Sequence, residues 1–330
     1  MDKIIANISN RTGNQLFRYA YARKLQQTYG GQLFLNFLAT ELMAEREPAG
    51  GWEEHLSEFK LADFRRIELG NRQLARQFFR GWQKLAFYLY LFLAKIFPKK
   101  MRSGNQSQNR FLIRFFCRKG LYIFPFVDMK SPLQPRQKTV YLDLPAENAD
   151  FYLEMAPVLR QEIRAKTSLS PENQAFLKRI QQTNSVCVTI RRGDYLSSQY
   201  QKDFFVTDEA YFSRGIAVLK EKINQPVFFF FSDDVSYIHE FTEKYLTAAD
   251  RYEMEAPATP IADKLTLMSS CKHFIISNST FSWWAQFLGS NPDKVVIGPK
   301  SWHPVGSENT NNLLIQDNWI KFRRQESCLE

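Results

Sequence analysis

Two adjacent arginines follow a short apolar run in the second half of the chain. Residues 186–190 are apolar or β-branched, which predicts a buried strand, and the turn after it reads Arg191, Arg192, Gly193, Asp194. Ligands of an open parallel sheet bind at the carboxyl ends of its strands, so this turn is a candidate site. The two guanidinium groups could hold a diphosphate, the glycine permits a tight turn, and Asp194 could orient an arginine or accept a proton. The alternative interpretation is an ordinary surface turn.

Paired carboxylates follow a second predicted strand. Residues 227–231 are apolar, and Asp233 and Asp234 come just after them. Their oxygens could accept hydrogen bonds from a nucleobase amino group or from sugar hydroxyls. The alternative is that one of them caps the helix predicted from Val235, which would leave the other unexplained.

A third polar run lies between a predicted strand at 273–277 and a predicted helix at 282–288. Small hydroxyl and amide side chains at a helix start leave backbone N–H groups exposed, which favours anion binding. A simple capping run is the alternative. We expect Trp283 and Trp284, which follow, to pack in the core rather than to stack on a ligand. The run extends from Ser277 to Trp284, and its candidate ligand-binding residues are Asn278, Ser279, Thr280 and Phe281.

The elements around these runs predict two α/β domains. The chain of 330 residues is long enough for two domains, and its 44% hydrophobic and 24% charged residues are typical of a folded globular protein. It opens with a strand ending before Arg11, a helix stopped by Gly30-Gly31, and a strand at 32–37, a β-α-β start that favours a parallel sheet. Prolines suggest that 131–152 is connecting chain. We therefore expect an N-terminal domain at 1–152 and a doubly wound domain at 153–330.

The second domain is predicted from an alternation of apolar strands and amphipathic helices. The predicted helices cover 153–166, 172–182, 209–222, 235–245, 262–270 and 282–288, and the last strand covers 294–297.

Positive charge is concentrated in one part of the N-terminal domain. The net charge is +10, yet residues 69–127 contain twelve Lys or Arg and no Asp or Glu. Within this basic insert, residues 85–97 are as apolar as a short membrane segment but number only 13. Either the apolar helix packs into the protein and the cations are solvated, or a basic aromatic surface lies on an anionic membrane, where each cation contributes about 1 kcal/mol. Nucleic acid is a weaker candidate partner, because no recognition motif accompanies the charge.

Several other classes of protein are disfavoured by absent motifs. The chain has no phosphate-binding glycine motif, no nucleophile elbow and no Asp-x-Asp pair, so a bound diphosphate would be neutralised by cations and a helix dipole rather than by a metal. The start is too quickly polar for a signal peptide, and the four scattered cysteines favour reduced thiols. We therefore expect a cytoplasmic protein, peripheral at the inner face of the plasma membrane if the basic insert binds lipid.

Taken together, three runs resemble glycosyltransferase family 11, the α-1,2-fucosyltransferases. The set is specific, whereas a single run would not be. The residues 231–234 and 317–321 share the likeness, which covers the chain ends and nearly all of 172–322. The three runs are Gly13-Asn14-Gln15-Leu16-Phe17 with Tyr19-Ala20, then Ile190 to Tyr195, then Cys271 to His273 continued by Asn278 to Trp284.

This resemblance implies a GT-B-type fold of two Rossmann-like domains, with the donor site in the C-terminal domain. The implied enzyme is an inverting, galactoside 2-α-L-fucosyltransferase-like hexosyltransferase that moves fucose from GDP-β-L-fucose to the 2-hydroxyl of galactose. No metal or other cofactor is expected. The expected setting is biosynthesis of a bacterial-type surface polysaccharide on a lipid carrier. The alternatives are transfer of another deoxysugar, use of another nucleotide, or a non-catalytic glycan- or nucleotide-binding homologue.

The residue roles follow from the same resemblance. Arg191 is expected to hold the β-phosphate as GDP leaves, with Arg192 in support, and Asp194 is the expected base. One aspartate of the 233–234 pair is expected to recognise guanine. The other expected donor-binding residues are Asn14 and Gln15, which would face the fucose and the β-phosphate, and Asn278, Ser279, Thr280 and Phe281.

Three positions depart from the family pattern. Thr189 stands where the family has a histidine two residues before the first arginine, a residue that helps to hold the guanine side of the donor. Asn10-Arg11-Thr12 replaces a glycine-led element before the first run, and 141–147 occupies the place of an expected Tyr-x-Gln segment. These changes bear on base recognition and on the acceptor rather than on the fold.

Overall fold

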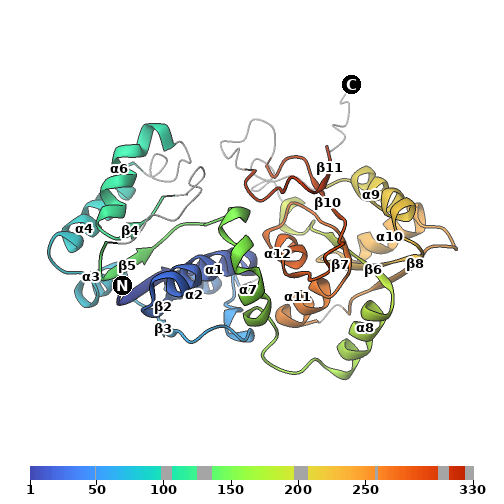
Figure 1. Ribbon diagram of the computed structural model, residues 1–330, viewed down its shortest axis with the longest axis horizontal. Helices are drawn as coiled ribbons and strands as arrows, with labels where there is room; N and C mark the ends of the chain where they lie inside the picture. Colours follow the sequence, from blue (N-terminus) through green and yellow to red (C-terminus); the bar gives the residue numbers. More distant parts are fainter. Residues whose placement is uncertain are drawn as a thin grey trace. The chain divides into compact units, whose positions relative to one another are not determined.

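The computed structural model describes residues 1–48, 50–97, 106–124, 136–196, 207–256, 259–303 and 312–323 (Figure 1). The chain forms two compact units. Unit 1 comprises residues 1–57 and 61–162, and unit 2 comprises residues 58–60 and 163–330. The sequence places the boundary ten residues earlier, at 152. The helix at 156–162 stays with unit 1 because Glu162 at its end binds Arg23, with an Nη2–Oε1 distance of 2.9 Å.

Unit 1 is built on a parallel sheet in the order β3-β2-β1-β5-β4. The neighbours β1 and β5 belong to parts of the chain more than 130 residues apart, so the order reverses between them and makes a switch point there. The strands are β1 (Lys3–Asn7), β2 (Gln32–Asn36), β3 (Arg65–Ile67), β4 (Leu121–Tyr122) and β5 (Thr139–Leu142).

The helices of unit 1 begin with the long α1, which follows β1 directly. Gly30 and Gly31 end it, both with positive φ (70° and 102°), and a Cβ on Gly31 would lie 2.9 Å from the carbonyl oxygen of Met1. The described helices are α1 (Thr12–Tyr29), α2 (Leu38–Arg46), α3 (Asn71–Gln77), α4 (Gly81–Ile96), α6 (Gln106–Arg118) and α7 (Ala156–Glu162). Short 3-10 turns lie at η1 (Leu56–Glu58), η2 (Ala149–Phe151) and η3 (Leu153–Met155).

One expectation for this region was wrong. The segment 131–152 is not all connecting chain, because its residues 139–142 form β5, the neighbour of β1 in the sheet. Val140, Tyr141 and Leu142 are buried there. The strand has only four residues and lies among prolines, so composition indicated a loop where contacts with β1 stabilise a strand.

Unit 2 contains a six-stranded parallel sheet in the order β11-β10-β9-β6-β7-β8. Numbered along the chain, this is 3-2-1-4-5-6 read from β8, the order of doubly wound nucleotide-binding sheets, with its switch point between β6 and β9. The strands are β6 (Asn184–Ile190), β7 (Pro226–Ser232), β8 (Arg251–Met254), β9 (His273–Ile275), β10 (Val296–Pro299) and β11 (Ile320–Phe322).

The helices of unit 2 alternate with these strands, and the core is aromatic. Phe228 to Phe231 on β7 are buried, and Trp283 on α12 stacks on Phe287 at 4.8 Å between ring centroids. Trp283 and Trp284 are fully buried, which confirms that they pack in the core. The helices are α8 (Pro171–Gln182), α9 (Glu209–Lys222), α10 (Val235–Tyr245), α11 (Ile261–Ser269) and α12 (Thr280–Leu288), with the 3-10 turn η4 (Asp194–Leu196).

Candidate functional site

The three polar runs of unit 2 lie at one edge of its sheet. They follow β6, β7 and β9, and the order β9-β6-β7 makes these strands immediate neighbours. In the parallel registers Ile190 lies beside Ser232, and Val188 beside Ile275, so the three strands end close together. The edge includes the β6–β9 switch point, where ligands of such sheets bind.

Each arginine of the first run is paired with an aspartate of the second. Arg191 Nη1 lies 2.9 Å from Asp233 Oδ2, and Arg192 Nε lies 3.2 Å from Asp234 Oδ2. The backbone N–H of Arg192 also donates to Asp233 Oδ1, at 3.0 Å. All four side chains remain about one quarter exposed, between 24% and 30%. The pairs therefore hold the guanidinium groups in place while leaving them open to a ligand from solvent.

Gly193 is required by the close approach of Asp233. A Cβ at position 193 would lie 2.6 Å from Asp233 Oδ2, the oxygen that binds Arg191. Any side chain there would displace this carboxylate. The sequence suggested that this glycine permits a tight turn. In the structure, its lack of a side chain allows Asp233 to pack against the turn.

The aromatic ring of Tyr237 supports the second pair. The guanidinium carbon of Arg192 lies 3.8 Å from the ring centroid, a cation–π contact. Asp234 accepts the backbone N–H of Tyr237 at 3.0 Å and so caps α10. The capping alternative is confirmed for Asp234, whereas Asp233 caps no helix and binds the turn after β6 instead.

The run after β9 is fixed mainly by backbone contacts. Asn278 is buried, its amide donates to Trp302 O at 3.2 Å, and its own carbonyl accepts the Tyr195 hydroxyl at 3.3 Å. Its side-chain oxygen Oδ1 is buried without a hydrogen-bond partner among the described residues. Ser279 precedes α12 without a side-chain cap bond, and Thr280 and Phe281 form its first turn. The first-turn N–H groups of this nine-residue helix point toward its start.

Thr189 joins the two sides of the switch point. Its side chain is buried in β6, and its hydroxyl oxygen accepts the backbone N–H of Ser277 at 3.2 Å. The residue that departs from the family pattern therefore uses its hydroxyl inside the protein, to hold the end of β9 against β6.

Sequence reasoning missed Glu255, which lies at the same edge. It follows β8, is almost fully buried, accepts the Ser232 N–H at 3.2 Å and binds Lys264 Nζ at 2.9 Å. Burial raises the pKa of this carboxyl group, while Lys264 lowers it. Oxygen Oε2 has no hydrogen-bond partner in the described part of the chain. The available signal was an acid directly after the hydrophobic end of a short strand, but β8 itself was not predicted.

The remaining predicted residues have different environments. Gln15 is fully buried in unit 1, where its amide donates to the carbonyls of Asn10 and Glu53 at 2.8 and 2.9 Å. Asn14 lies half-buried in the first turn of α1. The side chain of Asp194 falls outside the described residues, although its backbone begins η4.

A second polar cluster lies at the carboxyl edge of the unit 1 sheet, at its own switch point. Arg18 Nη1 donates to Asn7 O at 3.0 Å and binds Asp143 Oδ1 at 3.2 Å, and the Tyr90 hydroxyl donates to Asp143 Oδ2 at 3.1 Å. The Arg18 side chain is only 9% exposed, and its Nε lacks a partner among the described residues. This cluster joins the ends of β1 and β5 to helices α1 and α4.

Glu147 lies near this cluster without an ion pair among the described residues. Part of its surface remains exposed, but surrounding protein desolvates the carboxylate enough to raise its pKa to about 7, against a smaller lowering by Arg18. A carboxyl group with such a pKa can exchange a proton near neutral pH.

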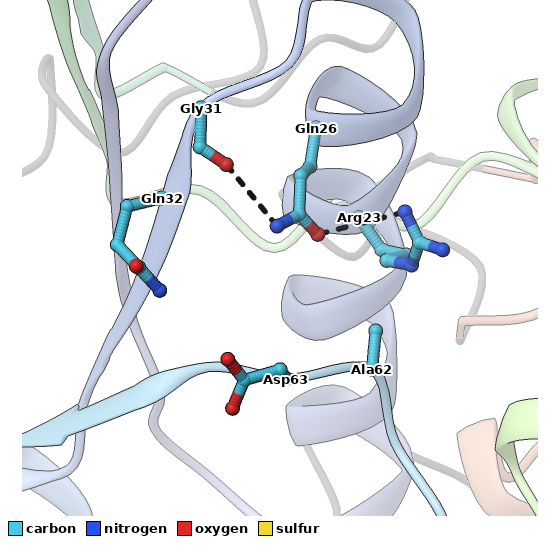
Figure 2. Close-up of a pocket in the computed structure, with 6 residues that line it drawn as sticks. All are labelled: Arg23, Gln26, Gly31, Gln32, Ala62 and Asp63. Carbon is cyan, nitrogen blue, oxygen red and sulfur yellow. Dashed lines mark hydrogen bonds between the residues drawn. The ribbon is translucent and has the colours of Figure 1, made fainter.

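A pocket of about 360 Å³ lies elsewhere in unit 1 (Figure 2). Its wall includes Gln32 at the start of β2, so it opens at the amino end of the sheet, opposite the edge where ligands are expected. Arg23 in its wall is bound to Glu162. The chemistry described above therefore lies at the strand ends and not in this pocket.

The described residues contain neither a candidate metal site nor a candidate membrane-spanning helix. They contain no group of three or more His, Cys, Asp or Glu side chains arranged to hold a metal ion. None of the helices in the described ranges is long and apolar enough to span a membrane.

Two α/β units, each built on a parallel sheet, are the architecture of a GT-B-type glycosyltransferase. A solved structure of this kind, a mutant of Arabidopsis thaliana FUT1 in complex with GDP, is similar with a TM-score of 0.50 and 10% identity, covering 90% of this chain and 70% of that one. The predicted fold class is thereby confirmed.

The chain belongs to glycosyl transferase family 11, because residues 91–323 match that family. An Escherichia coli alpha-1,2-colitosyltransferase is 34% identical over 157 residues, which are 47% of this chain and 53% of the relative. The mouse galactoside 2-alpha-L-fucosyltransferase Sec1 is 29% identical over 151 residues, 42% of this chain and 39% of the relative. The matches thus span about half, or less, of these relatives' length.

Proposed function

We propose that this protein is an inverting, metal-independent fucosyltransferase that moves L-fucose from GDP-β-L-fucose to a hydroxyl group of a glycan, the 2-hydroxyl of galactose. The observation that carries the proposal is the pair formed by Arg191 and Asp233, 2.9 Å apart at the carboxyl edge of a sheet with the strand order of nucleotide-binding sheets, in a family 11 chain. The mouse relative, by its name, acts on galactosides with fucose, which supports the sugar and the acceptor class.

The proposed chemistry is a single displacement at the anomeric carbon. The acceptor oxygen forms a bond to this carbon while the bond to the β-phosphate oxygen breaks, and the electron pair leaves with GDP. Arg191, oriented by Asp233, neutralises the charge that develops on the diphosphate, with Arg192 in support. The start of α12, at Ser279, Thr280 and Phe281, supplies partial positive charge for the same group.

The other proposed roles complete the donor site. The acceptor proton passes to a base, for which Asp194 is proposed, and Asp234, the aspartate that does not orient Arg191, is proposed to recognise guanine. Asn278 contributes its buried, unpaired Oδ1 as an acceptor. We propose that Asn14 and Gln15 of unit 1 take part in binding the fucose. Because the Gln15 amide donates to carbonyl groups within unit 1, its proposed role is to position the turn after β1.

The nucleotide can be tested by thermal unfolding of the full chain with GDP, UDP or dTDP. GDP at a hundredfold excess over its Kd should stabilise the protein by about 2.7 kcal/mol, because it binds only the folded state. UDP and dTDP should have little effect at the same concentration. Stabilisation by UDP without stabilisation by GDP would reject the donor assignment.

Colitose is a second candidate sugar, favoured by the 34% identity to the colitosyltransferase. Fucose and colitose are both deoxysugars, and the diphosphate chemistry proposed above serves either. Turnover of GDP-fucose and GDP-colitose on one β-galactoside acceptor, compared as kcat/KM, separates the two. A non-catalytic binding protein would bind GDP and turn over neither donor.

A further inference from the structure

Helix α4 of unit 1 has two apolar faces, and one of them is packed against the sheet. Ala86 and Phe87 are buried, and the Phe87 ring lies 5.2 Å from the ring of Tyr141 on β5. Gln83 Nε2 donates to the Thr139 carbonyl at 2.8 Å on the same strand. These contacts fix the helix to β5 by one side.

The opposite face of α4 carries large apolar side chains exposed to solvent. Their spacing of three and four residues places them along one side of the helix. Trp82 is 73% exposed and Phe92 is 58% exposed. A contiguous exposed stripe of this size marks an interaction surface in a protein that otherwise buries such residues. The residues of this α4 stripe are Trp82, Leu85, Leu89, Phe92 and Ile96.

Exposed cations without an ion pair among the described residues lie on α4 and on the helices α3 and α6. Helix α6 lies beside α4, with Phe116 in ring contact with Tyr90, and it adds the 80% exposed Phe111 (Figure 1). Within the described parts of 69–124, no lysine or arginine forms an ion pair, whereas Arg66 just before them binds three glutamates. The exposed cations of α3, α4 and α6 and of their flanks are Arg72, Arg76, Arg80, Lys95, Arg114 and Arg118.

We propose that the α4 stripe docks on an anionic lipid surface. Helix α4 would lie in the plane of the interface with Trp82, Leu85 and Phe92 at the boundary between headgroups and acyl chains, while the exposed cations bind lipid phosphates. Its 16 residues span about 24 Å at 1.5 Å per residue, too short to cross the roughly 30 Å hydrocarbon core. The surface belongs to unit 1 alone and would bind lipid whichever sugar the protein transfers.

Charge decides between lipid and a second copy of the chain. A two-fold dimer buries the same patch on both partners, so it would bring the unpaired cations of one copy against those of the other. No acid in residues 69–127 is present to compensate them. An anionic bilayer offers both an apolar interior and the opposite charge, and each cation near its surface strengthens binding about fivefold.

The test is co-sedimentation of the full chain with vesicles of phosphatidylcholine alone or with 30% phosphatidylglycerol. Binding should occur to the anionic vesicles and should weaken at least tenfold when the salt concentration is raised from 50 to 500 mM. Fluorescence gives an independent readout, since Trp283, Trp284, Trp302 and Trp319 are buried and Trp82 is the most exposed tryptophan described. Its emission should shift to the blue on binding, and Trp82→Phe should remove the shift.

Variants with matched controls locate the surface. Trp82→Ser combined with Phe92→Ser should weaken vesicle binding at least tenfold. Leu42→Ser combined with Leu153→Ser, which changes two other exposed apolar residues of unit 1 (42% and 54% exposed), should leave it unchanged. Near-ultraviolet circular dichroism of both pairs checks the fold.

Three results would overturn the proposal. Equal binding to neutral and anionic vesicles would remove the electrostatic argument. Loss of binding in the Leu42 and Leu153 control would move the surface elsewhere. A stable dimer in light scattering that the Trp82 and Phe92 changes dissociate, without binding to either vesicle, would assign the stripe to a second copy of the chain.

Discussion

The carboxyl edges of the two sheets have the same topological position and contrasting electrostatics. In unit 1 the central cation, Arg18, is 9% exposed and is bound by a backbone carbonyl and by Asp143. In unit 2 the cations Arg191 and Arg192 remain 29% and 24% exposed and are paired with aspartates that also face solvent. Two edges with the same topology therefore differ in how open their cations are to a ligand. A buried, internally bound charge holds the edge together, whereas a partly exposed, oriented charge is able to bind a ligand.

The largest effect is expected from Arg191→Ala at the unit 2 edge. Removing the guanidinium group that faces the diphosphate should lower kcat/KM by about a thousandfold, equivalent to roughly 4 kcal/mol of transition-state stabilisation, with little change in unfolding free energy. Steady-state transfer assays and urea unfolding measure the two quantities. Arg251→Ala, at an exposed arginine of unit 2, is the control and should alter neither. Unchanged turnover in the Arg191 variant would place the diphosphate elsewhere.

Arg18→Met at the unit 1 edge should lower the stability of the protein and leave its GDP binding unchanged. The change retains most of the side-chain stem but leaves Asp143 and the Asn7 carbonyl without their donor, so the free energy of unfolding should fall by about 3 kcal/mol. The Kd for GDP should be unchanged in the fraction that remains folded. Arg46→Met, at an exposed position of α2, is the matched control for urea unfolding. Full stability together with lost GDP binding would contradict the contrast between the edges.

The smallest effect concerns Glu147, a carboxyl group near the unit 1 edge that has no ion pair among the described residues. The folded-state pKa of Glu147 is about 7, above the ordinary value of 4.5, so the folded protein favours the protonated carboxyl. Its contribution to stability is therefore full below pH 4.5 and is lost as the pH rises through about 7. Glu147→Gln should be nearly neutral at pH 5 and stabilising by roughly 2 kcal/mol at pH 8, allowing for the solvent that reaches the group.

Urea unfolding of the two proteins across pH 5 to 8 measures this difference. Glu45→Gln, at an exposed glutamate of α2, is the matched control for the substitution itself. If Glu147→Gln gave the same constant difference at every pH, the carboxylate would not be titrating in this range.

Much of the unit 2 fold could be predicted from the sequence because its elements are long and strongly periodic. The helices predicted at 209–222 and 235–245 coincide with α9 and α10. The strand predicted at 186–190 begins only two residues earlier in the structure, as β6 (Asn184–Ile190). The short strands β3, β4, β5, β8 and β11 were not predicted. Their two to four residues carry too little periodicity, and pairing with distant neighbours stabilises them.

Part of the site could also be predicted from the sequence. Polar runs directly after apolar strands located Arg191, Asp233 and Asn278, since chain order and parallel pairing bring such ends to one edge. The specific pairs Arg191–Asp233 and Arg192–Asp234 depend on side-chain geometry, which no spacing reveals. Glu255 and the Arg18 cluster were missed, because each depends on a short strand that the sequence did not indicate.

The packing of Gly193 against Asp233 limits how this protein can diversify. A methyl group at position 193 meets only the end of a movable side chain, so the fold would tolerate it, yet the carboxylate that orients Arg191 would have to move. Selection for folding alone would therefore accept alanine at this position, and selection for transfer would restore glycine. A mutant library screened for new donor sugars should keep position 193 fixed and vary the residues after β8 and β9, where changes need not disturb that arginine.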